Sequence, residues 1–365
     1  MTYLERKFGF GSRRYPGEVA CVLSTLIQRG PLSLTELATF TGSGVPDLSR
    51  LAGALAARRL IISDGDAQET RLSATRRLRI NPDGAFSVGV IVDGDMLRIA
   101  VIDLERRIRK TASCFIGDKH LVDVVEIIQT ELRGTLNGAT YGTIEGICLS
   151  FTESASMTSR PQTLGDGDLT AANLRRDLSL TYRVPVFVEA EVAVAAIGEL
   201  QCGRAKSAES FVYILLDRDV SCGLVDNGKY VRSGKLGPLP LMDAANPGHS
   251  CHGETLGDML KTMVSGQHPI APFEAKQLAA FLFVPLLTLA NLVRPEMIYI
   301  NSGSVAMTER LCIELDQVAD VFNSTKGTIP TFACASARDI SAAVGAATIP
   351  FAFGLLRPHL LASRD

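Results

Sequence analysis

Residues 86–108, FSVGVIVDGDMLRIAVIDLERRI, and residues 211–233, FVYILLDRDVSCGLVDNGKYVRS, repeat one pattern that decides the fold. Each copy begins with an apolar strand, passes through an acidic turn of three residues and enters a second strand. In the second copy, Asn227-Gly228 then predicts a hairpin turn, because these residue types accept the positive φ angles of tight hairpins. The copies lie about 120 residues apart, which predicts a duplicated α/β architecture with a cleft between two lobes.

The sequence around the two copies alternates helical and strand-like segments. Apolar residues recur at helical spacing in the segments 121–136, 169–180, 192–201, 273–293 and 307–323. Short apolar segments predict strands at 144–149, 186–189, 297–300 and 331–334. This alternation is typical of an α/β protein with mostly buried sheets.

The first 80 residues follow a different pattern, three short helices and a hairpin. The first helix is predicted over residues 17–28 and the third over 46–58, with Pro46 in the first turn, where its missing N–H costs nothing. Strands over 60–63 and 70–80, joined by Asp64-Gly65-Asp66, predict a hairpin that forms a wing. The segment predicts a winged helix-turn-helix.

The second helix of this module carries a start signal. Ser33 and Glu36 have the three-residue spacing of a capping box, in which each residue binds the backbone N–H of the other. We expect Leu34, Leu37 and Phe40 to face inward, and Gly42 to end the helix.

Charge is distributed unevenly between the two parts of the chain. Residues 1–80 carry twelve Lys and Arg against seven Asp and Glu, a net charge of +5, while the remainder has a net charge of −7. A basic module attached to an acidic one indicates an anionic partner for the first part only. The alternative is a solvated charged surface on a three-helix packing module; the wing and the glycine turn favour DNA.

A helix-turn-helix places the N-terminal residues of its last helix near base edges in the major groove. Candidate base contacts at this position are Ser43, Asp47 and Ser49, although a carboxylate at Asp47 also repels phosphates. Contacts to phosphates, which position a protein without reading sequence, are predicted for Arg50, Arg58, Arg59 and Arg71.

The composition is that of a globular protein. The 365 residues are 46% hydrophobic and 21% charged, and the N-terminus lacks the apolar core of a signal peptide. The longest apolar run, 278–293, contains a proline and an asparagine and is shorter than the ~20 residues that span a membrane. The eight cysteines are scattered without zinc-ribbon or redox spacing, so we expect reduced, buried thiols in a cytoplasmic protein with no membrane association.

The chain resembles the transcriptional-regulator branch of the ROK family, the repressors, open reading frames and sugar kinases. The resemblance runs over residues 17–355, in the order GPLSLTELATFTGSGVPDLSRLAGALAARRLI, RINPDGAFSVGV, VPVFVEAEVAVAAIGE, LVDNGKYVRSG, ANLVRPEMIYINSG and ARDISAAVGAA. It implies a winged helix-turn-helix over 1–80 followed by a two-lobed actin-like, ribonuclease-H-like domain. The expected lobes are 81–190, to which 341–365 return, and 191–340.

Departures from the family kinases lie at both phosphate turns. Those kinases carry an Asp-x-Gly-x-Thr type turn after the first strand, where this chain has Ile91-Val92-Asp93-Gly94-Asp95. Their second turn is Gly-Thr-Gly with further glycines, and here it is Asp217-Arg218-Asp219 followed by Val220-Ser221-Cys222-Gly223. Glycines let backbone N–H groups approach phosphate oxygens. A carboxylate about 5 Å from a phosphate instead costs on the order of 3 kcal/mol at an effective dielectric near 20. The departures predict no nucleotide cofactor and no kinase activity.

The cleft segment departs in the same direction. Family enzymes have Glu-Asn-Asp-Ala-Asn there, with the Asp as general base, and this chain has Glu189-Ala190-Glu191-Val192-Ala193. Glu191 stands at the degenerate base position, one methylene longer than the Asp, so no catalytic residue is predicted. The Glu-x-Gly-His motif should fall at 237–245, where the sequence is GPLPLMDAA. Candidate effector contacts are Glu189, Glu191 and Leu241.

The family's cysteine-rich zinc loop should follow, and the sequence there is PGHSCHGETLGDML. His249, Cys251 and His252 are the candidate metal ligands, with Glu254 or Asp258 as a further ligand. Adjacent Cys251 and His252 are poorly placed to bind one tetrahedral ion. The expectation is therefore a loop without metal.

These observations favour a DNA-binding transcriptional regulator, a repressor, over two alternatives. Its large module would form a homodimer or homotetramer, and the resemblance implies a sugar or sugar-phosphate effector in the cleft. One alternative is an active sugar kinase with a DNA-binding appendage, which needs the missing glycines. The other is an effector-independent regulator or scaffold.

Overall fold

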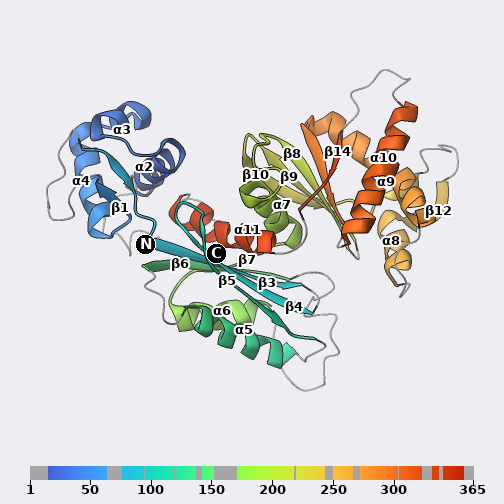
Figure 1. Cartoon of the computed structure of the whole chain (residues 1–365), viewed down its shortest axis with the longest axis horizontal. Helices are drawn as coiled ribbons and strands as arrows, with labels where there is room; N and C mark the ends of the chain where they lie inside the picture. Colours follow the sequence, from blue (N-terminus) through green and yellow to red (C-terminus); the bar gives the residue numbers. More distant parts are fainter. Residues whose placement is uncertain are drawn as a thin grey trace.

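The structure is a computed structural model that describes residues 15–63, 76–93, 95–117, 121–136, 142–151, 171–217, 219–242, 250–265, 272–302, 304–322, 331–336 and 340–356. It has an N-terminal helical module beside a large α/β domain of two lobes, each built on a five-stranded sheet (Figure 1).

The N-terminal module is a helix-turn-helix with the base of a wing. Its helices are α2 (Tyr15–Arg29), α3 (Leu34–Thr41) and α4 (Val45–Ala57). Strand β1 (Ile61–Ser63) pairs antiparallel with β2 (Leu78–Ile80), and Leu32 bridges to Leu78. The three predicted helices are confirmed within one or two residues at their ends. The tip of the predicted wing, 64–75, lies outside the described residues.

Helix α3 confirms the predicted start signal and corrects one predicted core residue. The Ser33 side chain accepts from the Glu36 backbone N–H, and the Ser33 N–H donates to Glu36 Oε2 at 2.7 Å. Leu34 and Leu37 are buried, but Phe40 is 45% exposed. Successive residues of a helix are rotated by 100°. Phe40 therefore points about 90° away from the mean direction of the Leu34 and Leu37 side chains. There the guanidinium of Arg29 covers its ring at 3.9 Å from the centroid.

The first lobe contains strands in the order β5-β4-β3-β6-β7. Its elements are β3 (Ala85–Asp93), β4 (Met96–Asp103), β5 (Ile108–Phe115), α5 (Leu121–Leu136), β6 (Thr143–Phe151), α6 (Ala171–Tyr182) and β7 (Val186–Val188). Alternate residues of β3 face opposite sides, since strand side chains have a period of two. Val88 and Val90 join the core under α5 and α6, while Ile91 faces the opposite core.

The second lobe repeats this plan, which confirms the duplication. Its strand order is β10-β9-β8-β13-β14. Its elements are α7 (Glu191–Cys202), β8 (Phe211–Leu216), β9 (Val220–Asp226), β10 (Lys229–Lys235), β11 (Pro240–Met242), β12 (Ser250–Thr255), α8 (Leu256–Ser265), α9 (Pro272–Val293), β13 (Met297–Asn301), α10 (Val305–Phe322) and β14 (Phe332–Cys334). The β9–β10 turn is formed by Asn227 and Gly228, both with positive φ, as predicted.

Helices α7 and α11 (Ile340–Pro350) lie between the lobes (Figure 1). Helix α11 packs on β3 so closely that a β-carbon on Gly89 would lie 2.0 Å from the Ala343 carbonyl oxygen. Helix α7 packs under the second sheet, where its Ala195 and Ala196 share a core with Phe211 and Tyr213 of β8. A π-helical turn, η1 (Phe351–Leu355), continues α11.

The apolar segment of helix α9 is longer than the run 278–293 identified in the sequence. Its segment Ala275–Val293, 19 residues, is long and apolar enough to cross a membrane by length and composition alone. Leu278, Leu282 and Leu286 are nevertheless fully buried in the core of the second lobe. The burial of this stripe is that of a core helix packed beneath a sheet.

Hydrogen bonds from Asn81 connect the N-terminal module to the large domain. The Asn81 side chain donates to the Arg59 carbonyl oxygen at 2.6 Å, and its backbone N–H donates to the Leu60 carbonyl oxygen at 2.9 Å. Arg59 itself has φ 60°, and a β-carbon on Gly84 would lie 2.0 Å from its carbonyl oxygen. The glycine therefore permits the end of α4 to touch the turn that opens the first lobe.

The seven cysteines whose side chains the structure describes are free thiols, but the prediction that they are buried is partly wrong. Cys148 and Cys312 are buried, and burial raises the pKa of both thiols. Cys21 and Cys202 are exposed. Cys21 lies within α2, and Cys202 is the last residue of α7.

Candidate functional site

The α3–α4 turn presents the surface that the sequence assigns to DNA. Gly42 ends α3 with φ 68°, and Gly44 begins α4, with Pro46 in its first turn. Ser43 lies between the helices, half-buried, and its N–H donates to the Thr41 hydroxyl at 3.4 Å. Leu48 and Leu51 anchor the other side of α4 in the core. The first turn of α4 is therefore held outward on a packed scaffold.

Asp47 is a predicted base contact and Arg50 a predicted phosphate contact, and the structure places them in contact with each other. Their side chains form an ion pair one turn apart on the exposed face of α4, with 55% and 69% of the side chains exposed. Ser49, between them in sequence, is half-buried. The pair compensates the repulsion that a lone Asp47 carboxylate would exert on a phosphate, and an exposed pair of this kind is weak enough to exchange for a phosphate contact.

The other predicted phosphate contacts lie elsewhere. Arg58 and Arg59 stand at the C-terminal end of α4, about 12 Å along the axis from Arg50 at 1.5 Å per residue. Arg59 is exposed, while its carbonyl group is part of the joint with Asn81. Arg71 lies outside the described residues. Among the described residues, Arg50 is thus separate from Arg58 and Arg59 along α4.

Basic residues beside the wing were missed by the site prediction. Arg79 is exposed on β2, and Arg77 lies 3.3 Å from Glu36 of α3. The backbone N–H and hydroxyl of Ser33, then Arg77, hold the pKa of the Glu36 carboxyl below its usual value. The sequence RRLR at 76–79 was the available signal, since alternation in a strand places Arg77 and Arg79 on the same face.

A cavity of about 380 Å³ occupies the cleft between the lobes. It is lined by the end of β6, the start of α7, the β8–β9 turn and the end of β10: Phe151, Ala190, Glu191, Val192, Leu215, Asp217, Asp219, Ser221, Ser233, Gly234 and Lys235. Among the described residues that line it, the charged groups are three carboxylates and one ammonium group. Among the candidate effector residues, Glu191 lies on this cavity.

The second phosphate turn is filled by a side chain of the chain itself. Asp219 Oδ1 accepts the backbone N–H of Val220 at 2.7 Å, and Asp219 Oδ2 lies 3.2 Å from Lys235 Nζ. A β-carbon on Gly237 would lie 1.6 Å from Asp219 Oδ1, so the carboxylate is packed against that glycine. A backbone donor and a cation that could serve a bound phosphate are therefore already engaged by a carboxylate.

The first phosphate turn also carries an engaged carboxylate. Asp93 Oδ2 lies 3.1 Å from the Arg98 guanidinium, and 17% of the Asp93 side chain is exposed. The backbone carbonyl of Asp95 accepts from the N–H groups of Ile116 and Gly117. Gly94, between the two acids, lies outside the described residues. The Asp93 carboxylate and the Asp95 backbone carbonyl thus support the strand connection.

Of the remaining predicted effector contacts, one is described away from the cavity and one has a side chain outside the described part of the chain. Glu189 is half-buried, and it does not line the cleft cavity in the described part of the chain. It lies instead near Cys148, whose raised pKa it reinforces after burial. Leu241 is in β11, and its side chain is outside what the structure describes.

The predicted metal candidates also fall where little is described. His249 lies outside the described residues, and Cys251 and His252 are in β12 with side chains that are not described. Within the described ranges, no group of three or more His, Cys, Asp and Glu side chains is placed to hold a metal ion. Asp258 instead accepts from the Thr255 hydroxyl at 2.7 Å at the start of α8.

Solved structures share this architecture. A ROK family transcriptional regulator, described as a homologue of the E. coli MLC protein, superposes with a TM-score of 0.68 at 18% identity, over 95% of this chain and 98% of its own. The ROK hexokinase from Thermus thermophilus superposes with a TM-score of 0.53 at 19% identity, over 77% of this chain and 100% of its own. At these identities the likeness is one of fold.

Sequence comparisons point to the same family as the solved structures. The xylose repressors of Bacillus subtilis and Bacillus spizizenii are 24% and 23% identical over 245 residues, 63% of this chain. The chain matches 62% of the length of each of these relatives, which is less than two thirds. The model of the ROK family matches residues 88–266, from β3 to the end of α8. The segment of this chain that follows the N-terminal helix-turn-helix is therefore similar to the ROK family over residues 88–266.

Proposed function

We propose that this protein is a DNA-binding transcriptional regulator, a repressor that acts in the cytoplasm, and not an enzyme. The observation that carries the proposal is the attachment of a winged helix-turn-helix to a ROK domain whose second phosphate turn is filled by Asp219. The repressor names of the curated relatives support the same function.

The DNA contact is assigned to the α3–α4 turn and the first two turns of α4. Ser43 and Ser49 are the side chains offered to base edges, and Asp47 joins them when its ion pair with Arg50 opens. Arg50 then binds a phosphate, and Arg58, Arg59 and Arg71 extend the phosphate contacts toward the wing. Arg77 and Arg79 add positive charge on that side.

The ROK domain serves dimerisation and effector sensing in this proposal. A homodimer or homotetramer would present paired α4 helices to a palindromic site with half-sites about 34 Å apart or a multiple of that distance. A carbohydrate effector in the cleft cavity, held by Glu191, would change the relative position of the lobes and so the spacing of the helices.

Kinase activity is the competing function, because Glu191 places one carboxylate on the cleft cavity. Two features oppose it. The Asp219 carboxylate occupies a backbone donor of the second turn, and Asp217 adds another negative group beside the place of a triphosphate. Repulsion of this kind weakens nucleotide binding unless a cation compensates.

The test is selection of genomic DNA fragments by the purified full-length chain. We expect enrichment of a small set of fragments that share an inverted repeat. Enrichment of no fragment above random DNA would refute the DNA-binding function. A parallel assay measures ATP turnover with a panel of hexoses and pentoses, with Glu191→Gln as the matched variant. Turnover that the variant abolishes would establish the kinase instead.

A further inference from the structure

A second cavity lies where the helix-turn-helix meets both lobes, apart from the cleft. Its volume is about 540 Å³, within the usual range of small-molecule sites. One wall is α2 of the DNA-binding module, with Ser24, Ile27 and Gln28. The other walls are α7, the β9–β10 turn, the end of α11 with η1, and Arg106 from the β4–β5 connection. We call this the junction cavity.

The lining of the junction cavity is positively charged and otherwise mostly apolar. Arg106 and Lys229 contribute two cations, and no Asp or Glu of the described residues lines it. This contrasts with the net charge of −7 carried by residues 81–365. Its apolar surface is contributed by Ile27, Ile197, Leu200, Ile349, Phe353 and Leu356. The lining therefore suits an anion with an apolar body.

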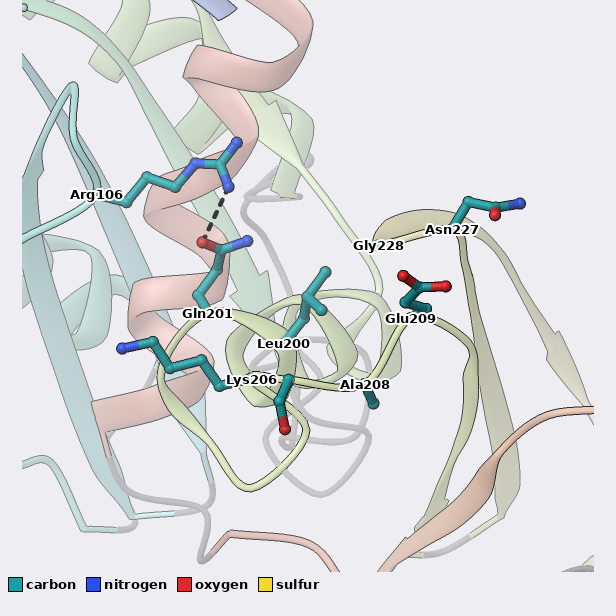
Figure 2. A pocket seen from close by; sticks show the side chains of 9 residues that line it. Arg106, Leu200, Gln201, Lys206, Ala208, Glu209, Asn227 and Gly228 are labelled. Atoms are coloured by element: carbon teal, nitrogen blue, oxygen red, sulfur yellow. Dashed lines mark hydrogen bonds between the residues drawn. The ribbon is translucent and has the colours of Figure 1, made fainter. Parts of the chain in front are cut away.

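Arg106 is the group that gives the cavity its specificity. Within the described residues, its guanidinium has one side-chain hydrogen bond, from Nη1 to Gln201 Oε1 at 3.1 Å, and no carboxylate partner (Figure 2). Desolvation by burial lowers the pKa of the guanidinium, which nevertheless stays charged at neutral pH. A half-buried cation whose side-chain hydrogen bond goes to a neutral amide gains from an added carboxylate, which its planar fork binds bidentately.

The backbone holds Arg106 in place. Its φ is 66°, in the left-handed region that residues other than glycine rarely adopt. The fully buried Asp103 stabilises this turn, because its carboxylate accepts from the Arg107 N–H at 2.9 Å and from the Arg109 guanidinium at 3.2 Å. The guanidinium of Arg106 is thus presented from a fixed support.

A neighbouring cavity extends the site. It has a volume of about 520 Å³, shares Arg106, Leu200, Gln201, Asn227 and Gly228 with the junction cavity, and continues along Lys206 and Glu209 (Figure 2). The two spaces meet at the Arg106–Gln201 hydrogen bond, where Figure 2 shows both side chains reaching toward each other. An anion on Arg106 is therefore reachable from the surface on the side of Lys206.

We propose that the junction cavity binds a small monoanionic carboxylate with an apolar body, and that its occupancy changes the affinity of the protein for DNA. The carboxylate lies on Arg106 and the apolar body against Ile197, Ile349 and Phe353. Because α2 forms one wall, a ligand that favours one position of α2 relative to α7 and η1 shifts the helix-turn-helix with it. This second step rests on the proposed DNA-binding function, and the first does not.

Ligand binding is measured without DNA by fluorine NMR, with 4-fluorobenzoate as the probe. Its uncharged counterpart is 4-fluorobenzyl alcohol, and inorganic phosphate tests for general anion binding. The variants are Arg106→Met, Arg106→Lys, which retains a cation, and Arg107→Met, a neighbour whose side chain is 68% exposed in a surface ion pair with Glu105. Ala352→Phe fills the cavity and leaves Arg106 in place. Melting temperatures establish that each variant is folded.

We expect 4-fluorobenzoate to bind the wild type and Arg107→Met alike, and to lose about tenfold or more in affinity for Arg106→Met. Arg106→Lys should recover part of that loss, Ala352→Phe should abolish binding, and phosphate should not compete. No binding to the wild type, equal binding to Arg106→Met and Arg107→Met, or equal binding of the alcohol would overturn the site.

The regulatory step is measured on a fragment recovered by the DNA selection. Saturating 4-fluorobenzoate should change the DNA affinity of the wild type at least about threefold and leave that of Arg106→Met unchanged. An unchanged wild-type affinity despite bound probe would overturn the coupling alone. Arg106→Met without probe should bind DNA as the wild type does, so failure of the ligand site and failure of DNA binding give different results.

Discussion

Gly345 of α11 lies directly against Gly198 of α7 where the two helices cross between the lobes. A β-carbon on Gly345 would come within 1.9 Å of the Val194 carbonyl oxygen and 2.6 Å of the Gly198 backbone nitrogen. A β-carbon on Gly198 would in turn lie 2.1 Å from the Ser341 carbonyl oxygen. The helices that carry the two lobes therefore touch backbone to backbone, so movement of one lobe relative to the other must pass through this crossing.

Gly345→Ala should destabilise the protein by about 3 kcal/mol, because the new methyl group meets backbone that has no rotamer by which to yield. Gly134→Ala in α5 is the matched control, since a β-carbon there has nothing within 4 Å. That change should stabilise by roughly 0.4–1 kcal/mol. Urea denaturation of both variants checks this, and equal midpoints would mean that the crossing is looser than described.

Asn81→Ala should cost about 1–3 kcal/mol of stability, because it removes a buried donor to the Arg59 carbonyl oxygen and an acceptor for the Asp83 N–H. Asn291→Ala is the control, since its side chain makes a comparable 2.9 Å bond to the Leu287 carbonyl oxygen on the exposed side of α9. That variant should stay within about 0.5 kcal/mol of the wild type. Melting temperatures distinguish the two variants. Equal shifts would contradict a stabilising role for the Asn81 hydrogen bonds.

Glu36→Gln should change the acid dependence of stability. The pKa of Glu36 is lowered in the folded protein by its hydrogen bonds with Ser33, so the carboxylate stabilises the fold above its unfolded pKa near 4.5. This contribution is lost as the pH falls through the lower folded pKa. The wild type should therefore lose stability relative to Glu36→Gln below about pH 4.5, with a constant difference above it. Parallel curves down to pH 3 would contradict the capping role.

A sugar effector in the cleft should be sensed through Glu191 and not through Glu189. Glu191 lines the cleft cavity, while Glu189, two residues away, does not. A panel of pentoses, hexoses and their phosphates should include a compound that raises the melting temperature of the wild type by mass action. Glu191→Ala should abolish that shift, and Glu189→Ala should retain it. A shift that persists in Glu191→Ala would place the effector elsewhere.

The repeated strand patterns were sufficient to predict the antiparallel pairs β3–β4 and β8–β9, because strand alternation is a local signal, as is the Asn227-Gly228 turn after β9. Helix α5 was predicted with the bounds that the structure has, Leu121–Leu136. Strand β5 was missed, since its residues 108–115 alternate between exposed and half-buried positions and contain few apolar side chains. Sequence periodicity detects buried faces, and an edge strand has little of one.

The sites were harder to predict than the fold, because they depend on contacts between distant segments. The pairing of Asp47 with Arg50 follows from helical spacing and was available from the sequence. The position of the Asp219 carboxylate in the second phosphate turn depends on its contacts with Lys235 and Gly237. These residues lie at the end of β10 and just after it, 16 and 18 positions further along the chain. The junction cavity joins Ser24 to Phe353, and no local pattern relates residues so far apart.

The salt dependence of DNA binding tests the central claim, that the chain holds duplex DNA through the N-terminal half of α4. Fluorescence anisotropy would be recorded on a selected fragment and on a random duplex, for wild type, Arg50→Ala and Lys276→Ala, an exposed control on α9. We expect Arg50→Ala to weaken binding to both duplexes and to reduce the slope of log affinity against log salt by about 0.9, with Lys276→Ala unchanged. Affinity and slope for Arg50→Ala equal to those of the wild type would contradict the account.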